Sequence, residues 1–113
     1  MYRFFDKHNY REPYIYIHPY KQQIVKQVVE NVFDEIDYVI VFGSAVTTAC
    51  KPYSDLDICV IGEFDEEKLR ALRIKGEDMD ILHFSEVKDL LEDKILAREV
   101  EKGVVVYGQN IAV

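Results

Sequence analysis

The chain has 113 residues, of which 49% are apolar and 31% charged, so it can form one domain with a single modest hydrophobic core. Its formal net charge of −7 argues against a broad nucleic-acid surface, which normally presents a basic patch, and fits a basic protein partner. No apolar run approaches the roughly 20 residues that span a membrane, and residues 1–10 lack the apolar core of a signal peptide. We therefore expect a cytoplasmic protein.

Aromatic side chains crowd the first 20 residues, where Pro13 and Pro19 interrupt any long helix. We expect residues 1–20 to form an arm. The arm either packs over the core of its own domain or serves as a docking element, because half-buried aromatic side chains are good interface anchors. Residues 21–113 are then expected to form the domain itself.

Hydrophobic periodicity divides residues 21–113 into alternating helices and strands. Apolar residues at three- and four-residue steps predict a helix over residues 21–36. Short runs rich in β-branched residues predict strands at 38–42, 55–61, 79–84 and 104–107. Further helices are expected at 45–50, at 65–74 and from an N-cap at Ser85 to residue 102, the last as one bent helix or two. This order predicts an α/β or α+β fold in which helices cover a small mixed sheet.

The most informative stretch is residues 38–61. Gly43 and Ser44 end the first predicted strand, where glycine lets the backbone approach a ligand and a following helix would point free N–H groups at an anion. Asp55 and Asp57 begin the second strand two residues apart, so their carboxylates project from one face. Each motif alone is an ordinary turn or a solvated strand start. Together they form a layout for phosphoryl transfer, since Mg²⁺ is held by one or two carboxylates plus substrate phosphates.

A third acid lies at the head of the strand at 79–84. We prefer Asp80, which directly precedes the apolar run, over Asp78, which shares its face because the two are two residues apart. A third carboxylate would complete a two-metal site or take the proton from an attacking hydroxyl. Cys59 is interpreted as a small buried residue, and His83 as a structural residue on the face opposite Asp80.

These residues carry a resemblance to a known family. Gly43-Ser44, ten intervening residues, Asp55-Leu56-Asp57 and the later Asp80-Ile81-Leu82 resemble the signature of the DNA polymerase β-type nucleotidyltransferase superfamily. Within it, the chain resembles the minimal nucleotidyltransferases, the MntA-like antitoxin group, whose closing helix and strand are similar to residues 95–107.

The resemblance implies the fold, the reaction and the partner. It implies a polymerase β-like nucleotidyltransferase fold, with ATP as substrate and two Mg²⁺ ions held by Asp55, Asp57 and Asp80. Gly43 and Ser44 would then bind the nucleotide phosphates. The implied partner is a HEPN-domain toxin, an RNase that receives AMP on a tyrosine, which would make this protein an antitoxin.

The chain departs from the family pattern after the Gly-Ser pair. Many members carry an arginine and a second glycine there to grip the triphosphate, where this chain has Ala45-Val46-Thr47-Thr48. Thr47, Thr48 and Lys51 could substitute for these residues in part. The departure motivates an alternative, a non-catalytic module that neutralises its partner by occlusion. Another alternative is a small-molecule nucleotidyltransferase that dimerises to build its acceptor pocket. The nucleotide, the acceptor and the oligomeric state stay open.

Overall fold

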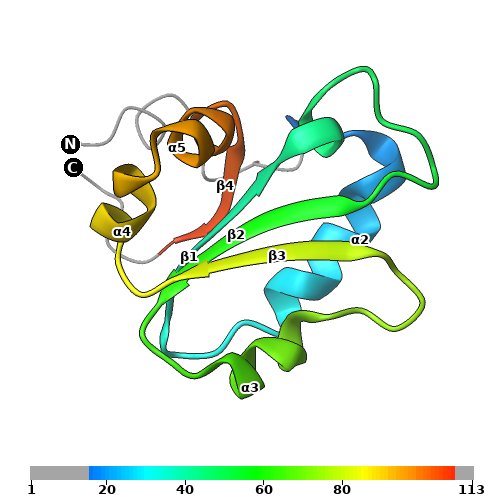
Figure 1. The fold of residues 1–113 in the computed structure, drawn as a ribbon. Helices are drawn as coiled ribbons and strands as arrows, with labels where there is room; N and C mark the ends of the chain where they lie inside the picture. Colours follow the sequence, from blue (N-terminus) through cyan, green and yellow to red (C-terminus); the bar gives the residue numbers. More distant parts are fainter. Residues whose placement is uncertain (1–15, 109–113) are drawn as a thin grey trace.

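The fold is built on a four-stranded sheet ordered β3–β2–β1–β4 (Figure 1). The computed structural model describes residues 16–108. The strands are β1 (Ile36–Phe42), β2 (Leu56–Gly62), β3 (Met79–Phe84) and β4 (Val104–Gly108). β1 is antiparallel to β2 and β4, whereas β2 and β3 are parallel, so the sheet is mixed as predicted. The greater part of the predicted arm, residues 1–20, lies outside the described residues.

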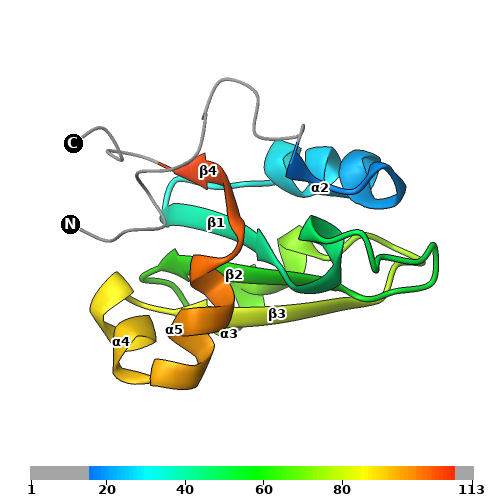
Figure 2. The same cartoon turned by 90° about the horizontal axis from the view of Figure 1, so that it is seen from above.

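Helices cover both faces of this sheet. Figure 2 shows α2 (Pro19–Glu30) on one side and α4 (Val87–Glu92) and α5 (Lys94–Glu101) on the other. Strand alternation supplies the two apolar faces: Leu56, Ile58 and Val60 belong to the core cluster beneath α2, and Cys59 and Ile61 to the cluster beneath α4 and α5. The layered α/β architecture confirms the predicted fold class. Within residues 16–108, every helix is too short or too polar to span a bilayer.

The first helix is shorter than the predicted 21–36. It begins at Pro19 and ends at Glu30. Proline is favourable at the first helical position, because an N–H there would have no partner within the helix. The Asn31 N–H closes the last turn on the Val28 carbonyl at 3.0 Å. Ile36 continues the helical spacing in the sequence but starts β1 instead, fully buried opposite Gly62. Sheet pairing at this position prevails over the local helical pattern.

The expected helix at 45–50 does not form. A 3-10 turn over Gly43–Val46 follows β1, and the chain then bends at Thr47. The Thr47 hydroxyl donates to the Ser44 carbonyl at 2.9 Å and accepts from the Ala49 N–H at 3.2 Å. Such side-chain hydrogen bonds to the nearby backbone compete with helix continuation, which explains why the predicted helix is absent here.

The remaining helices differ from prediction mainly at their ends. The segment expected at 65–74 is a short α3 (Glu66–Leu69) continued by a 3-10 turn over Arg70–Leu72. The segment 85–102 is two helices, separated at Asp93, whose carboxylate accepts from the Leu96 N–H and starts α5. Glu86, and not Ser85, caps α4, because it forms a reciprocal capping box with Asp89.

Candidate active site

Three strand ends meet at one edge of the sheet and bring the predicted motifs together. β1 ends at this edge, and β2 and β3 begin there, since β2 is antiparallel to β1 and parallel to β3. Asp57 is the register partner of Phe42 on one side and of Asp80 on the other. Neighbouring strands lie about 4.8 Å apart, so the Asp57 and Asp80 side chains stand next to each other on one face.

The electrostatics of Asp57 reflect this crowding. Asp57 is half-buried, whereas Asp55 and Asp80 are exposed. Burial, followed by the negative charges of Asp80 and then Asp55, raises the pKa of the Asp57 carboxyl above its ordinary value. The structure therefore holds a carboxylate in surroundings that penalise its charge. A cation beside it would reverse that penalty.

Gly43 contacts this carboxylate directly. Its φ of +73° is a left-handed conformation that glycine adopts without strain. A β-carbon at Gly43 would lie 2.2 Å from Oδ2 of Asp57, closer than any real contact. The absence of a side chain at Gly43 thus lets the turn after β1 press against the acid. The turn that the sequence predicts to bind phosphate therefore lies directly against Asp57, one of the two acids of the predicted pair.

The donor set fits Mg²⁺ that arrives with a nucleotide. In the described part of the chain, no three His, Cys, Asp or Glu side chains converge closely enough to hold a metal ion by themselves. Mg²⁺ does not need such a cage, because it is usually bound by one or two carboxylates with substrate phosphates and water. The carboxylate oxygens of Asp57 and Asp80 lie on adjacent strands and match that requirement. Asp55 is close enough for its negative charge to raise the pKa of Asp57.

A cavity of about 270 Å³ adjoins the turn. It is lined by Gly43, Val46, Thr47, Glu99 and Lys102. Glu99 lies in α5 and Lys102 is its C-cap, and neither was predicted as a site residue. No local signal marks them, because only the packing of α5 and β4 against β1 brings them to Gly43. Thr47, in contrast, already donates its hydroxyl proton to Ser44, so its role in the turn is structural.

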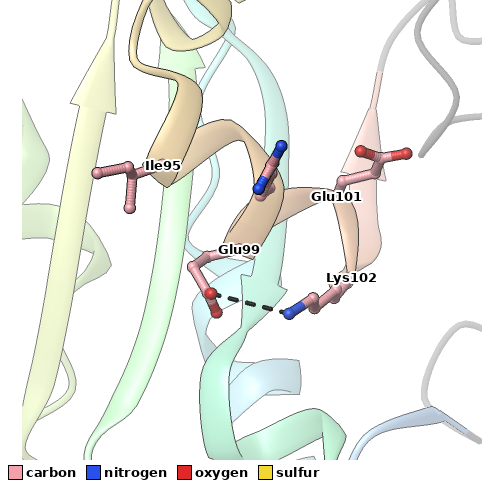
Figure 3. Close-up of a pocket in the computed structure, with 5 residues that line it drawn as sticks. Ile95, Glu99, Glu101 and Lys102 are labelled. Atoms are coloured by element: carbon pink, nitrogen blue, oxygen red, sulfur yellow. Dashed lines mark ion pairs between the residues drawn. The ribbon is translucent and has the colours of Figure 1, made fainter.

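A larger hollow of about 590 Å³ lies along α5 and borders none of the three acids. It shares Glu99 and Lys102 with the cavity at Gly43 and is otherwise lined by Ile95, Arg98 and Glu101 (Figure 3). We place the site at the smaller cavity, because that cavity adjoins the turn that touches Asp57.

The other residues considered in the sequence lie in separate surroundings. The Asp78 carbonyl accepts from the Leu56 N–H at 3.0 Å, and Asp78 lines a different cavity beside the buried Lys21. Cys59 is fully buried beneath α4 and α5, and burial raises the pKa of its thiol to about 12. The thiol is therefore protonated at neutral pH and does not act as a nucleophile. His83 stacks on Phe64 and shares a 2.8 Å hydrogen bond with the Gly62 carbonyl, as a structural residue would.

Comparison with known proteins identifies the family. Residues 22–112 match the family model described as "Polymerase beta, Nucleotidyltransferase". That span contains all four strands of the described sheet, the Gly43–Ser44 turn and the three acids. No curated protein matches the chain. Because the family model covers residues 22–112, the chain belongs to the polymerase β-type nucleotidyltransferase family.

Proposed function

We propose that this protein transfers AMP from ATP to a tyrosine hydroxyl of a partner HEPN-domain toxin and thereby acts as its antitoxin. The observation that carries the proposal is the register that places Asp57 beside Asp80, with Gly43 pressed against the Asp57 carboxylate. Family membership supports nucleotidyl transfer. The resemblance of the motifs and of residues 95–107 to the minimal nucleotidyltransferases supports a tyrosine of a HEPN-domain toxin as the acceptor.

The described residues divide the chemistry between them. Asp55, Asp57 and Asp80 would hold Mg²⁺ together with the nucleotide phosphates, and the bound metal would neutralise charge that develops at the α-phosphorus. The turn at Gly43 and Ser44 would hold the β- and γ-phosphates. The acceptor oxygen forms a bond to the α-phosphorus, the bond to the β-phosphate oxygen breaks, and pyrophosphate leaves. The hydroxyl proton passes to Asp80 or to a water bound by it.

The exposure of the site favours a macromolecular acceptor. Asp55 and Asp80 are both exposed at this end of the sheet. A small-molecule substrate is normally held in a concave pocket that buries most of its surface. An open acidic edge instead leaves room for a side chain presented by another protein, whose own surface completes the acceptor site.

The test is transfer of label from α-labelled ATP in the presence of Mg²⁺ and the product of the neighbouring gene. Asp55→Asn/Asp57→Asn should abolish the transfer, because both changes remove carboxylate charge from the site. Asp37→Asn is the control, since Asp37 is an exposed aspartate of β1 that lies at the end of the strand remote from the three acids. Tandem mass spectrometry of the labelled partner should place AMP on a tyrosine.

Two outcomes would contradict the proposal. A stable complex that takes up no label from any of the four nucleotides would favour a module that neutralises its partner by occlusion. Label on a small molecule, with a dimer in sedimentation velocity, would favour the small-molecule enzyme.

A further inference from the structure

The cavity at Gly43 brings one basic side chain to the proposed phosphate site. Of the described residues that line it, Lys102 alone is positively charged. The three acids on the neighbouring strand ends are all negative, so they repel a triphosphate that comes without metal. The β- and γ-phosphates, which lie beyond the acids in the proposed arrangement, need a cation of their own.

The backbone of Lys102 is held against the end of β1. Gly103 follows it, and a β-carbon there would lie 2.4 Å from the Val41 carbonyl oxygen. The Gly103 N–H donates to the Val100 carbonyl at 2.8 Å, and Val104 then pairs with Val41 in the sheet. Gly103 directly follows residue 102, where the sequence predicts the helix to end. In the fold, its missing side chain also lets the end of α5 approach the strand that leads into Gly43.

The side chain of Lys102 remains available for a ligand. Its Nζ lies 3.8 Å from Oε1 of Glu99, and the two side chains reach toward each other from α5 (Figure 3). Both are more than half exposed, at 72% for Lys102 and 54% for Glu99. Exposed ion pairs of this kind contribute little stability, so a phosphate oxygen can replace the Glu99 carboxylate.

We propose that Lys102 binds the β- and γ-phosphates of the nucleotide in this cavity and that Glu99 holds its ammonium group until the nucleotide arrives. The inference rests on the proposed function and extends it to substrate selection. Lys102 discriminates nucleoside triphosphates and pyrophosphate from nucleoside monophosphates, because only the former place phosphate groups beyond Gly43. It also supplies, from the C-cap of α5, a positive charge that residues 45–48 lack.

The test is isothermal titration calorimetry with ATP, pyrophosphate and AMP as separate probes, each with Mg²⁺. Lys102→Gln should weaken binding of ATP and pyrophosphate by about tenfold, as expected for the loss of one charge-assisted hydrogen bond, and leave AMP binding unchanged. Glu99→Gln should tighten ATP binding, because it frees Lys102 and removes a negative charge. Lys88→Gln is the matched control, since Lys88 is also exposed and paired with a glutamate, Glu86, at 3.2 Å.

The outcomes separate this inference from the proposed function. Equal losses in Lys102→Gln and Lys88→Gln, or an equal loss for AMP, would overturn the role of Lys102 and leave the transferase proposal intact. Lys102-dependent ATP binding without label transfer would overturn the transferase proposal and keep the phosphate site. A wild-type protein that binds neither ATP nor pyrophosphate would overturn both.

Discussion

The contact between Gly43 and Asp57 makes a substitution at Gly43 the sharpest test of the site. Gly43→Ala places a methyl group in a left-handed backbone conformation and 2.2 Å from Oδ2 of Asp57. Gly76→Ala separates the two effects, because Gly76 has a similar φ of +85° and no heavy atom lies within 4 Å of the place that its methyl group would take. The pair therefore shares the backbone strain and differs in the clash.

The magnitudes follow from these two contributions. The left-handed conformation destabilises an L-residue by roughly 1–2 kcal/mol, and this applies at both positions. At Gly43 the Asp57 carboxyl must also rotate away, which adds about 1 kcal/mol for an off-rotamer side chain, and up to about 3 kcal/mol if the backbone has to move. Gly43→Ala should thus be destabilised by about 1–3 kcal/mol more than Gly76→Ala. It should also lose Mg²⁺-dependent transfer, because the displaced group is the proposed metal ligand.

Urea unfolding at neutral pH without nucleotide measures these differences, and the same two substitutions are then made in an Asp57→Ala background. Of the three heavy atoms nearest to the added methyl group, removal of the carboxyl deletes those at 2.2 and 3.0 Å and leaves the Asp57 β-carbon, at 3.3 Å. The excess loss at Gly43 should therefore largely disappear in that background. The contact would be refuted if Gly43→Ala and Gly76→Ala lowered the free energy of unfolding equally in the wild-type background. It would also be refuted if the larger loss in Gly43→Ala persisted after removal of the Asp57 carboxyl.

Three further predictions concern the charge, the thiols and the core. Asp57→Asn should stabilise the metal-free protein at pH 7. Because the pKa of Asp57 is raised, the free energy of unfolding of the wild-type protein should increase as pH falls through that pKa toward the ordinary value of 3.8. Urea unfolding at a series of pH values should show that the variant lacks this increase. Cys50 and Cys59 should react with a thiol reagent only after unfolding, since both are buried, and labelling of the native protein at the unfolded rate would contradict their placement. Leu90→Ala should lose about 2–5 kcal/mol because Leu90 is fully buried. Ile95→Ala, at a side chain 78% exposed, should change stability by no more than about 0.5 kcal/mol, and similar losses would argue against the burial pattern.

The sequence by itself determined the four strands to within a few residues. Each is a short β-branched run bounded by turn residues, and alternation along β2 explains why Leu56, Ile58 and Val60 pack on the face opposite Asp57. These features depend on neighbouring residues, which is why they can be predicted locally. The Gly-Ser turn and its spacing to the acids pointed to the family for the same reason, since both motifs are contiguous in the chain.

Only the tertiary structure decided where the strands pair and which distant residues meet. Ile36 fits a helical stripe but belongs to β1, because its pairing with Gly62 is a long-range contact. The adjacency of Asp57 and Asp80 depends on the parallel register of β2 and β3, and a shift of one residue would place one carboxylate on the opposite face. Lys102 reaches Gly43 only because β4 pairs with β1 and Gly103 permits close packing. Such contacts join residues far apart in the chain, so no local pattern encodes them.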